Sequence, residues 1–224
     1  MHDPESFQII IARYTEDVSW IDDALRPHTI IYNKGPPLPL DVAKTFQSVH
    51  QLPNVGREYH TYLHHIYTHY DDEKLDHVSL FIQGNITDHI PLTYRYGNES
   101  NYLRHLLSQA HRIGLSLNFG PHDVGFLSAK ENLKLADAFR DLVDSRMSFG
   151  EWFRRYIDRY ASNPLKSHNI FWYLGAIFAV DKKHIHNRSR AFYKKLCDMV
   201  SKENSYEIGH YLERSWFHIF SHNQ

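Results

Sequence analysis

Short runs of β-branched, apolar residues alternate with helix-type segments in the first part of the chain, and this alternation restricts the possible folds most. Residues 7–12, 28–32 and 78–82 are mostly apolar, as expected of strands buried on both faces of a parallel sheet. Residues 15–25 are helix-compatible, and residues 57–70 carry apolar and aromatic side chains at helical spacing. The alternation therefore predicts βαβ units and a parallel sheet.

The remainder of the chain is richer in helix-type periodicity. It predicts a late strand at residues 171–180 and helices at residues 100–113, 129–143, 148–160, 188–201 and 207–220. Alternating strands and helices followed by such mixed elements indicate a mixed sheet. We therefore predict an α/β fold in one domain, residues 1–224, with a mostly parallel central sheet flanked by helices on both faces.

Charge and hydropathy argue against several classes of protein. Among 224 residues, Lys and Arg total 25 and Asp and Glu total 26, a formal net charge of -1 without any block of like charges; this argues against general nucleic-acid binding. The longest apolar runs fall short of the roughly 20 residues that a membrane span needs. An acidic N-terminus and the lone Cys197 predict an intracellular, cytoplasmic protein without a signal peptide.

Polar residues gather where the predicted strands end and where the helix at residues 57–70 begins. The carboxyl ends of parallel strands face one edge of a sheet, so these residues should meet in one cleft. Turn formation alone also explains polar loops, but four groups in register favour a ligand site. The residues are Arg13, Tyr14, Glu16 and Asp17, then Asn33 and Lys34, then Asn54, Gly56 and Arg57, and finally Gln83, Gly84 and Asn85.

The residue types in this predicted cleft suit a nucleotide. Arg57 at a helix N-terminus can bind phosphate, because free N–H groups and the helix dipole favour an anion there and a guanidinium forms paired hydrogen bonds. The acidic residues after the first strand, together with Asn33, are of the kind that holds ribose hydroxyls and base edges. Tyr14 or Tyr32 can stack on a base. The sequence thus predicts a phosphate-bearing ligand.

Seven motifs spread over nearly the whole chain point to a family. They are IARYTEDVSW at 11–20, YNKG at 32–35, LPNVGRE at 52–58, TYL at 61–63, FIQG at 81–84, GAIFAV at 175–180 and ERSW at 213–216. Together they resemble an uncharacterised family found in fungi, plants, algae and large algal viruses. These motifs do not establish an activity.

The turn Tyr14-Thr15-Glu16 and the order of the predicted elements also resemble, more distantly, nucleotide-sugar glycosyltransferases of the GT-A type, such as those encoded by algal viruses. This resemblance implies a nucleoside-diphosphate sugar as donor, a UDP-sugar above all, with Asn33 on its base. The sugar would pass to a glycan, a glycoprotein or another hydroxyl acceptor.

The same resemblance implies a divalent metal ion. GT-A enzymes bind Mn²⁺ or Mg²⁺ through an Asp-x-Asp motif at the end of the next strand, but this chain has QGN at residues 83–85. Asp88 and His89 follow a few residues later, and His210 lies near the C-terminus. These three side chains are the metal ligands expected here, since they suit a hard cation that bridges two phosphates.

An inverting transfer also needs a carboxylate that takes the proton of the acceptor hydroxyl. Glu151 in FGEW resembles the acceptor-side acidic residue of such enzymes, and Glu213 in HYLER is the second candidate. Each also has a plainer explanation. Glu151 would stabilise the N-terminus of a helix through the helix dipole, and Glu213 would pair with basic neighbours or with solvent.

Two other functions stay open at this point. The missing Asp-x-Asp carboxylates suit a non-catalytic module that binds a nucleotide sugar or a carbohydrate. The pairs formed by His60, His64, His65 and His69 have the i,i+4 spacing of helical zinc ligands, which suits a histidine-dependent metal hydrolase. A solvated helix face with tyrosines beneath it explains the same histidines more simply.

Overall fold

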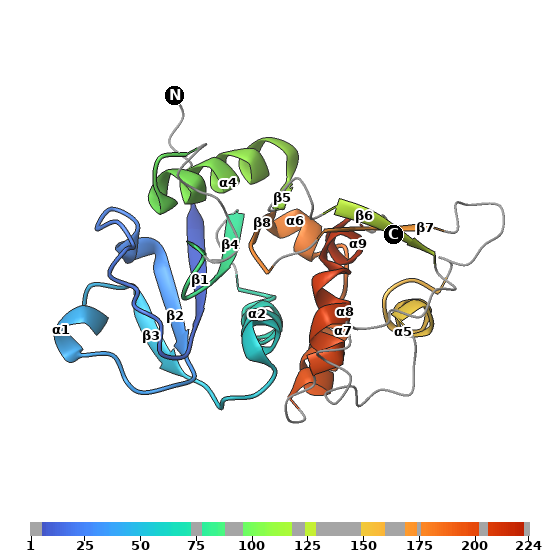
Figure 1. Ribbon diagram of the computed structural model, residues 1–224, viewed down its shortest axis with the longest axis horizontal. Helices are drawn as coiled ribbons and strands as arrows, with labels where there is room; N and C mark the ends of the chain where they lie inside the picture. The colour runs from blue at the N-terminus through green and yellow to red at the C-terminus, as the bar shows by residue number, and fades with distance from the viewer. Residues whose placement is uncertain are drawn as a thin grey trace.

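The sheet is built around β1 (Phe7–Arg13) in the computed structural model (Figure 1), which describes residues 6–72, 78–87, 96–117, 124–128, 149–159, 169–173, 176–201 and 206–221. Ile9, Ile10 and Ile11 of this strand are fully buried. Ile10 faces one apolar cluster, whereas Ile9 and Ile11 face the other. The apolar run at the start of the chain is therefore a strand covered on both faces, as its composition predicts.

The central sheet has the strand order β3-β2-β1-β4-β8-β5. The first four strands in this order are parallel to one another, and β8 is antiparallel to both of its neighbours. The prediction of an α/β fold with a mostly parallel mixed sheet is therefore confirmed. The further strands are β2 (Thr29–Asn33), β3 (Ser48–Gln51), β4 (Val78–Gln83), β5 (Leu115–Leu117) and β8 (Phe178–Asp181).

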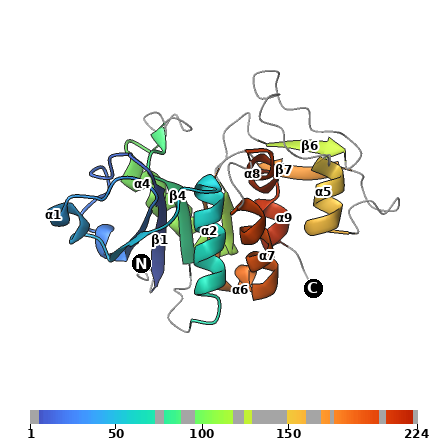
Figure 2. The ribbon, with the colours of Figure 1, turned by 90° about the horizontal axis from the view of Figure 1, so that it is seen from below.

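Helices cover both faces of this sheet, as predicted (Figure 2). On one face α2 (Arg57–Thr68) lies against the strands, and α7 (Arg190–Val200), α8 (Tyr206–Glu213) and α9 (Trp216–Phe220) pack beyond it in the same apolar cluster. On the other face α4 (Glu99–Ile113) buries Leu103, Leu106 and Ala110 against β4 and β8. This arrangement leaves the carboxyl ends of the parallel strands beside the N-terminus of α2.

The helix predicted at residues 15–25 is absent, and that prediction is wrong. Asp17 accepts hydrogen bonds from the backbone and hydroxyl of Ser19, and Asp22 accepts one from the backbone of Ala24. Such local side-chain acceptors satisfy backbone donors outside a helix and so favour turns. The connection from β1 to β2 consists of turns and ends in the short 3-10 helix η1 (Arg26–His28).

Two long predicted elements are each divided in two. The apolar run at residues 171–180 contributes β8 to the central sheet and β7 (Asn169–Tyr173) to a separate two-stranded sheet with β6 (Val124–Ser128). The helix predicted at 207–220 becomes α8 and α9, with Ser215 between them. The Ser215 hydroxyl donates to the Tyr211 carbonyl oxygen at 2.6 Å, which satisfies an acceptor at the end of α8.

The remaining elements are short. The sequence did not predict α1 (Leu40–Ala43), α6 (Lys182–Ile185), β3 or β5, which have three or four residues each. The helix predicted at 148–160 is present as α5 (Phe149–Tyr156), whereas the one predicted at 129–143 lies outside the described residues. Within the described ranges, no helix combines the length and the apolar character that crossing a bilayer requires.

Candidate functional site

The order of the strands fixes where a ligand should bind. The chain passes from β1 to β2 and on to β3 on one side, and then returns to place β4 on the other side of β1. The direction of winding therefore changes between β1 and β4. In open α/β sheets, ligands bind outside the carboxyl ends of the strands at such a switch point. Here these ends are Arg13 and Gln83.

A cleft of about 330 Å³ lies at this switch point. Seven of the residues that the sequence predicts for donor binding line it, and they come from the ends of β1, β2 and β4 and from the start of α2. The prediction that these loops meet in one hollow is confirmed. The full lining is Ala12, Arg13, Tyr14, Glu16, Lys34, Asn54, Arg57, Glu58 and Gln83.

Arg13 and Asn33 hold the wall of the cleft together. Arg13 Nη1 donates to Asn33 Oδ1 at 2.6 Å and to the Pro36 carbonyl oxygen at 3.0 Å. Asn33 Nδ2 donates to the carbonyl oxygens of Gly35 and Pro36 and to Gln51 Oε1. Asn33 is 1% exposed and does not line the cleft. Its amide fixes the loop after β2, so the structure gives no support to the predicted contact with a base.

Two glycines let the loops of the site approach closely. A Cβ on Gly35 would lie 2.1 Å from the carbonyl oxygen of Tyr14, and one on Gly84 would lie 2.9 Å from Glu16 Oε2. The Glu16 carboxylate also accepts a hydrogen bond from the Tyr14 backbone N–H at 2.6 Å. Gly84 does not line the cleft; its role is to leave room for Glu16.

The loop before α2 has a strained backbone that a lysine stabilises. Gly56 and Arg57 have φ values of 56° and 47°, in the left-handed region that favours glycine. The Lys34 ammonium donates to the carbonyl oxygens of Val55 and Arg57. Burial lowers the pKa of Lys34 to about 8. A Cβ on Gly56 would lie 2.3 Å from the Val200 carbonyl oxygen, so Gly56 shapes the loop rather than lining the cleft.

Glu58 is a cleft residue that the sequence analysis missed. It is the second residue of α2, and the sequence carries no signal for its position beyond lying beside Arg57. Its side chain is partly buried, and burial raises the pKa of its carboxyl group. The neighbouring charge of Glu213 acts in the same direction, whereas a hydrogen bond from the buried Tyr59 hydroxyl opposes it. A carboxyl group of this kind is suited to proton transfer.

Glu213 and His210 lie on α8, which packs against α2, the helix that carries Glu58. Glu213 Oε2 is 3.3 Å from His210 Nδ1 and 3.9 Å from Arg214 Nη1. Gly209 lets α8 approach α2, because a Cβ there would lie 2.7 Å from the Tyr59 ring. Glu213 therefore influences Glu58 electrostatically without lining the cleft itself.

Glu151 lies far from this arrangement. It is exposed in the first turn of α5, and both ribbon views place α5 beyond α7 and α8 as seen from α2 (Figures 1 and 2). A carboxylate in this position stabilises the helix N-terminus. The structure therefore favours the plainer explanation of Glu151 over a catalytic one.

The other predicted polar residues mainly form turns or lie outside the described residues. Asp17 is exposed, and hydrogen bonds from Ser19 lower the pKa of its carboxyl group. Asn85 Oδ1 accepts hydrogen bonds from the Thr87 backbone and hydroxyl. Asp88 and His89 fall in a range that the structure does not describe. Across the described ranges, no group of three or more His, Cys, Asp or Glu side chains is arranged to hold a metal ion.

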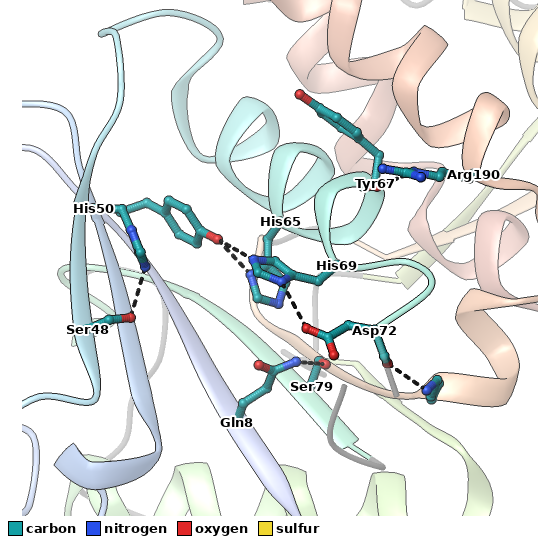
Figure 3. A network of polar contacts seen from close by, with 11 residues as sticks. Gln8, Ser48, His50, His65, Tyr67, His69, Asp72, Ser79 and Arg190 are labelled. Atoms are coloured by element: carbon teal, nitrogen blue, oxygen red, sulfur yellow. Dashed lines mark hydrogen bonds and ion pairs between the residues drawn. The ribbon is translucent and has the colours of Figure 1, made fainter. Parts of the chain in front are cut away.

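His65 of α2 and His69, just after the last residue of this helix, belong to a polar network between α2 and β2 (Figure 3). The Tyr32 hydroxyl is hydrogen-bonded to His65 Nδ1 at 2.9 Å and lies 3.5 Å from His69 Nε2, and His69 Nδ1 lies 3.7 Å from Asp72. Burial lowers the pKa of His65 well below its ordinary value. His65 is therefore a neutral core residue between β2 and α2, which gives no support to the hydrolase alternative.

Comparisons with known proteins add a family but no activity. No curated protein matches the chain, and no solved structure matches it. One family matches residues 9–224, nearly the whole sequence, under the description "Protein of unknown function (DUF3431)". The chain belongs to this family.

Proposed function

We propose that this protein is a glycosyltransferase that transfers a sugar from a nucleoside-diphosphate sugar, a UDP-sugar in the first instance, to a hydroxyl acceptor such as a glycan or glycoprotein. The observation that carries the proposal is the cleft at the switch point between β1 and β4. Its lining combines cationic, aromatic and carboxylate side chains, and each of these has a task in binding or transfer.

The cationic side of the cleft suits a diphosphate. Arg57 and Lys34 line it beside the N-terminus of α2, a helix of 12 residues. The free N–H groups and the dipole of a helix N-terminus favour an anion, and a guanidinium adds charge-assisted hydrogen bonds. In sugar transfer the same groups would stabilise the negative charge that develops on the departing nucleoside diphosphate.

The aromatic and acidic residues suit the nucleoside. Tyr14 lines the cleft and is 48% exposed. An exposed ring at a cleft is suited to stacking on a base. The Glu16 carboxylate, fixed by the Tyr14 backbone N–H, is suited to accept hydrogen bonds from ribose hydroxyls.

Glu58 supplies the base in this proposal. Its carboxylate would accept the proton of the acceptor hydroxyl as the acceptor oxygen forms its bond to the sugar carbon and the bond from that carbon to the diphosphate breaks. Burial and the nearby charge of Glu213 raise the pKa of Glu58, which makes the carboxylate a stronger base. Tyr59 donates a hydrogen bond to it and so orients it.

The proposal is tested by binding and by turnover. Calorimetric titration with UDP, GDP and CMP, each with and without Mn²⁺, should show binding of UDP or GDP. A higher nucleotide affinity in the presence of Mn²⁺ would support the predicted Mn²⁺ or Mg²⁺ at Asp88, His89 and His210. Release of UDP from a UDP-sugar, accelerated by an acceptor, should then identify a transferase. Tight binding without turnover would favour the binding module, and the absence of nucleotide binding would contradict both functions.

Arg57→Ala should weaken UDP binding about 10- to 100-fold, because a charge-assisted hydrogen bond contributes roughly 1.5–3 kcal/mol and about 1.4 kcal/mol corresponds to a factor of ten. Arg112→Ala is the matched control, since Arg112 is exposed on α4, at the other face of the sheet. Calorimetry on both variants makes the measurement. Equal UDP affinity in the two would remove Arg57 from the site.

UDP affinity should also depend on pH through Lys34. The pKa of about 8 is lowered from 10.5 by burial, so the free protein loses this positive charge as the pH rises through about 8. Binding a diphosphate above that pH requires proton uptake, which lowers the affinity by up to about tenfold per pH unit. In Lys34→Met the affinity should be weaker and nearly constant from pH 7 to 9. A wild-type affinity that does not change over this range would contradict a role for Lys34.

A further inference from the structure

A second hollow, of about 360 Å³, lies at the end of α5, where it meets the link between α6 and α7. Four arginines and one aspartate line it, which gives the lining a formal charge of +3 in a chain whose net charge is -1. The lining is Arg154, Arg155, Tyr156, Ile157, Asp158, Arg159 and Arg188. None of these residues lines the cleft at the switch point.

Arg188 is held in place at one side of this hollow. Its Nε and Nη2 lie 3.4 Å from the carbonyl oxygens of Ile219 and His218, to which they donate, and its guanidinium carbon lies 4.8 Å from the centre of the Phe192 ring. The side chain is partly buried, and burial lowers the pKa of the guanidinium while Asp158 opposes the change. The hydrogen bonds and the ring contact thus fix the position of the Arg188 guanidinium before any ligand binds.

Tyr156 brings one further cation, Lys195, close to the hollow. The guanidinium carbon of Arg155 lies 5.5 Å from the centre of the Tyr156 ring, and Lys195 Nζ of α7 lies 5.1 Å from it. Cations near an aromatic face are attracted by its quadrupole, so this ring keeps two positive charges close together. The positive surface therefore extends from α5 to α7.

The helix dipole explains part of this charge but not all of it. Arg154 and Arg155 lie in the last turn of α5, where cations offset the negative end of the dipole. Arg159 comes after that turn, and Arg188 comes from a different part of the chain. The helix dipole therefore accounts for only two of the four guanidinium groups that line the hollow. A bound anion would interact favourably with all four.

We propose that this hollow binds a multiply charged phosphate group. Several guanidinium groups from two segments can form paired hydrogen bonds to phosphate oxygens, and guanidinium is the side-chain group best matched to phosphate geometry. The proposal does not depend on the function assigned to the cleft. A soluble polyphosphate and a phosphorylated lipid headgroup share this chemistry.

Calorimetric titration with inorganic tripolyphosphate tests the site. All variants in this titration carry Arg57→Ala, because this substitution weakens phosphate binding at the switch-point cleft, which would otherwise contribute to the measured heat. In that background, adding Arg155→Ala and Arg159→Ala, both at exposed positions, should lower tripolyphosphate affinity at least tenfold. Lys44→Ala, at an exposed position next to α1, should leave the affinity unchanged. Without the Arg57 substitution, the Arg155/Arg159 double variant should bind UDP as the wild type does, which separates this site from the cleft.

Sedimentation with vesicles distinguishes the two sources of phosphate. Binding to phosphatidylcholine vesicles that contain phosphatidylinositol 4-phosphate, lost in the double variant and absent with phosphatidylcholine alone, would identify a lipid headgroup. Tripolyphosphate binding without vesicle binding would identify a soluble phosphate ligand. Tripolyphosphate affinity that is equal with and without the Arg155 and Arg159 substitutions, in protein whose thermal unfolding is unchanged, would overturn the proposal.

Discussion

Glu58→Gln should lower the rate of sugar transfer about 10²–10⁴-fold, the range that a positioned general base contributes. Glutamine has nearly the same shape as glutamate but cannot accept the proton of the acceptor hydroxyl. Glu58 also lies beside the cationic residues that bind the diphosphate, so UDP affinity in Glu58→Gln should stay equal or rise slightly. The measurement is the initial rate of acceptor-dependent UDP release at saturating donor, with UDP affinity by calorimetry.

The pH profile gives a second readout of the same role. Burial raises the pKa of Glu58 above its ordinary value of 4.5, so the active carboxylate is lost as the pH falls through that raised pKa. The wild-type rate should therefore decline on the acid side at a higher pH than an ordinary glutamate would produce. Glu58→Gln should lack this acid limb, whereas a residue that only supports the fold would leave the limb in place.

Glu151→Gln is the matched control, and Glu213→Gln tests the second glutamate that the sequence proposes as the base. Glu151→Gln should transfer sugar at the wild-type rate, because no residue of α5 lines the cleft and α5 lies beyond α7 and α8 as seen from α2 (Figure 1). Glu213→Gln should move the acid limb to lower pH, because the charge of Glu213 contributes to the raised pKa of Glu58. A large rate loss in Glu151→Gln together with an active Glu58→Gln would place the chemistry elsewhere.

The sequence predicted the sheet well because burial on both faces leaves a clear pattern. The apolar runs that became β1, β2 and β4 have few polar interruptions, and parallel strands require this. The segment after β1 was predicted as a helix because its composition permits one, yet Asp17 and Asp22 satisfy backbone donors locally. Composition over a window does not show which backbone groups a short acidic side chain will satisfy.

The site was predictable in place but not in detail. Residues that follow parallel strands must meet at one edge, so the loops of the cleft could be found without coordinates. Which of their side chains face the cleft depends on contacts between distant residues. The Asn33 side chain is hydrogen-bonded to Gln51 and Arg13 instead of facing the cleft. Glu58 faces the cleft because the backbone just before it, at Gly56 and Arg57, is left-handed. Nothing in the spacing of these residues signals either orientation.

Gly35→Ala should both destabilise the protein and distort the cleft. The new Cβ would lie 2.1 Å from the Tyr14 carbonyl oxygen and 2.7 Å from its carbonyl carbon, so a backbone segment has to move. Forcing extra atoms into a packed site costs about 1–3 kcal/mol, and more where backbone is displaced. For a chain of this size, 2–3 kcal/mol lowers the Tm by roughly 5–10 °C, which a thermal unfolding scan will measure.

Gly97→Ala separates this clash from the general effect of losing a glycine. Gly97 has a φ of 79°, and among the described residues a Cβ there meets only Asn101 Nδ2, at 4.0 Å. Alanine at this position is therefore penalised by about 1 kcal/mol for the left-handed backbone. Gly35 has no such backbone strain, and its whole effect comes from the contact with Tyr14. Because that contact sets the position of Tyr14 in the cleft, Gly35→Ala should also weaken UDP binding, whereas Gly97→Ala should not. A Gly35→Ala variant with wild-type Tm and wild-type UDP affinity would mean that the loops after β1 and β2 do not touch as the structure has them.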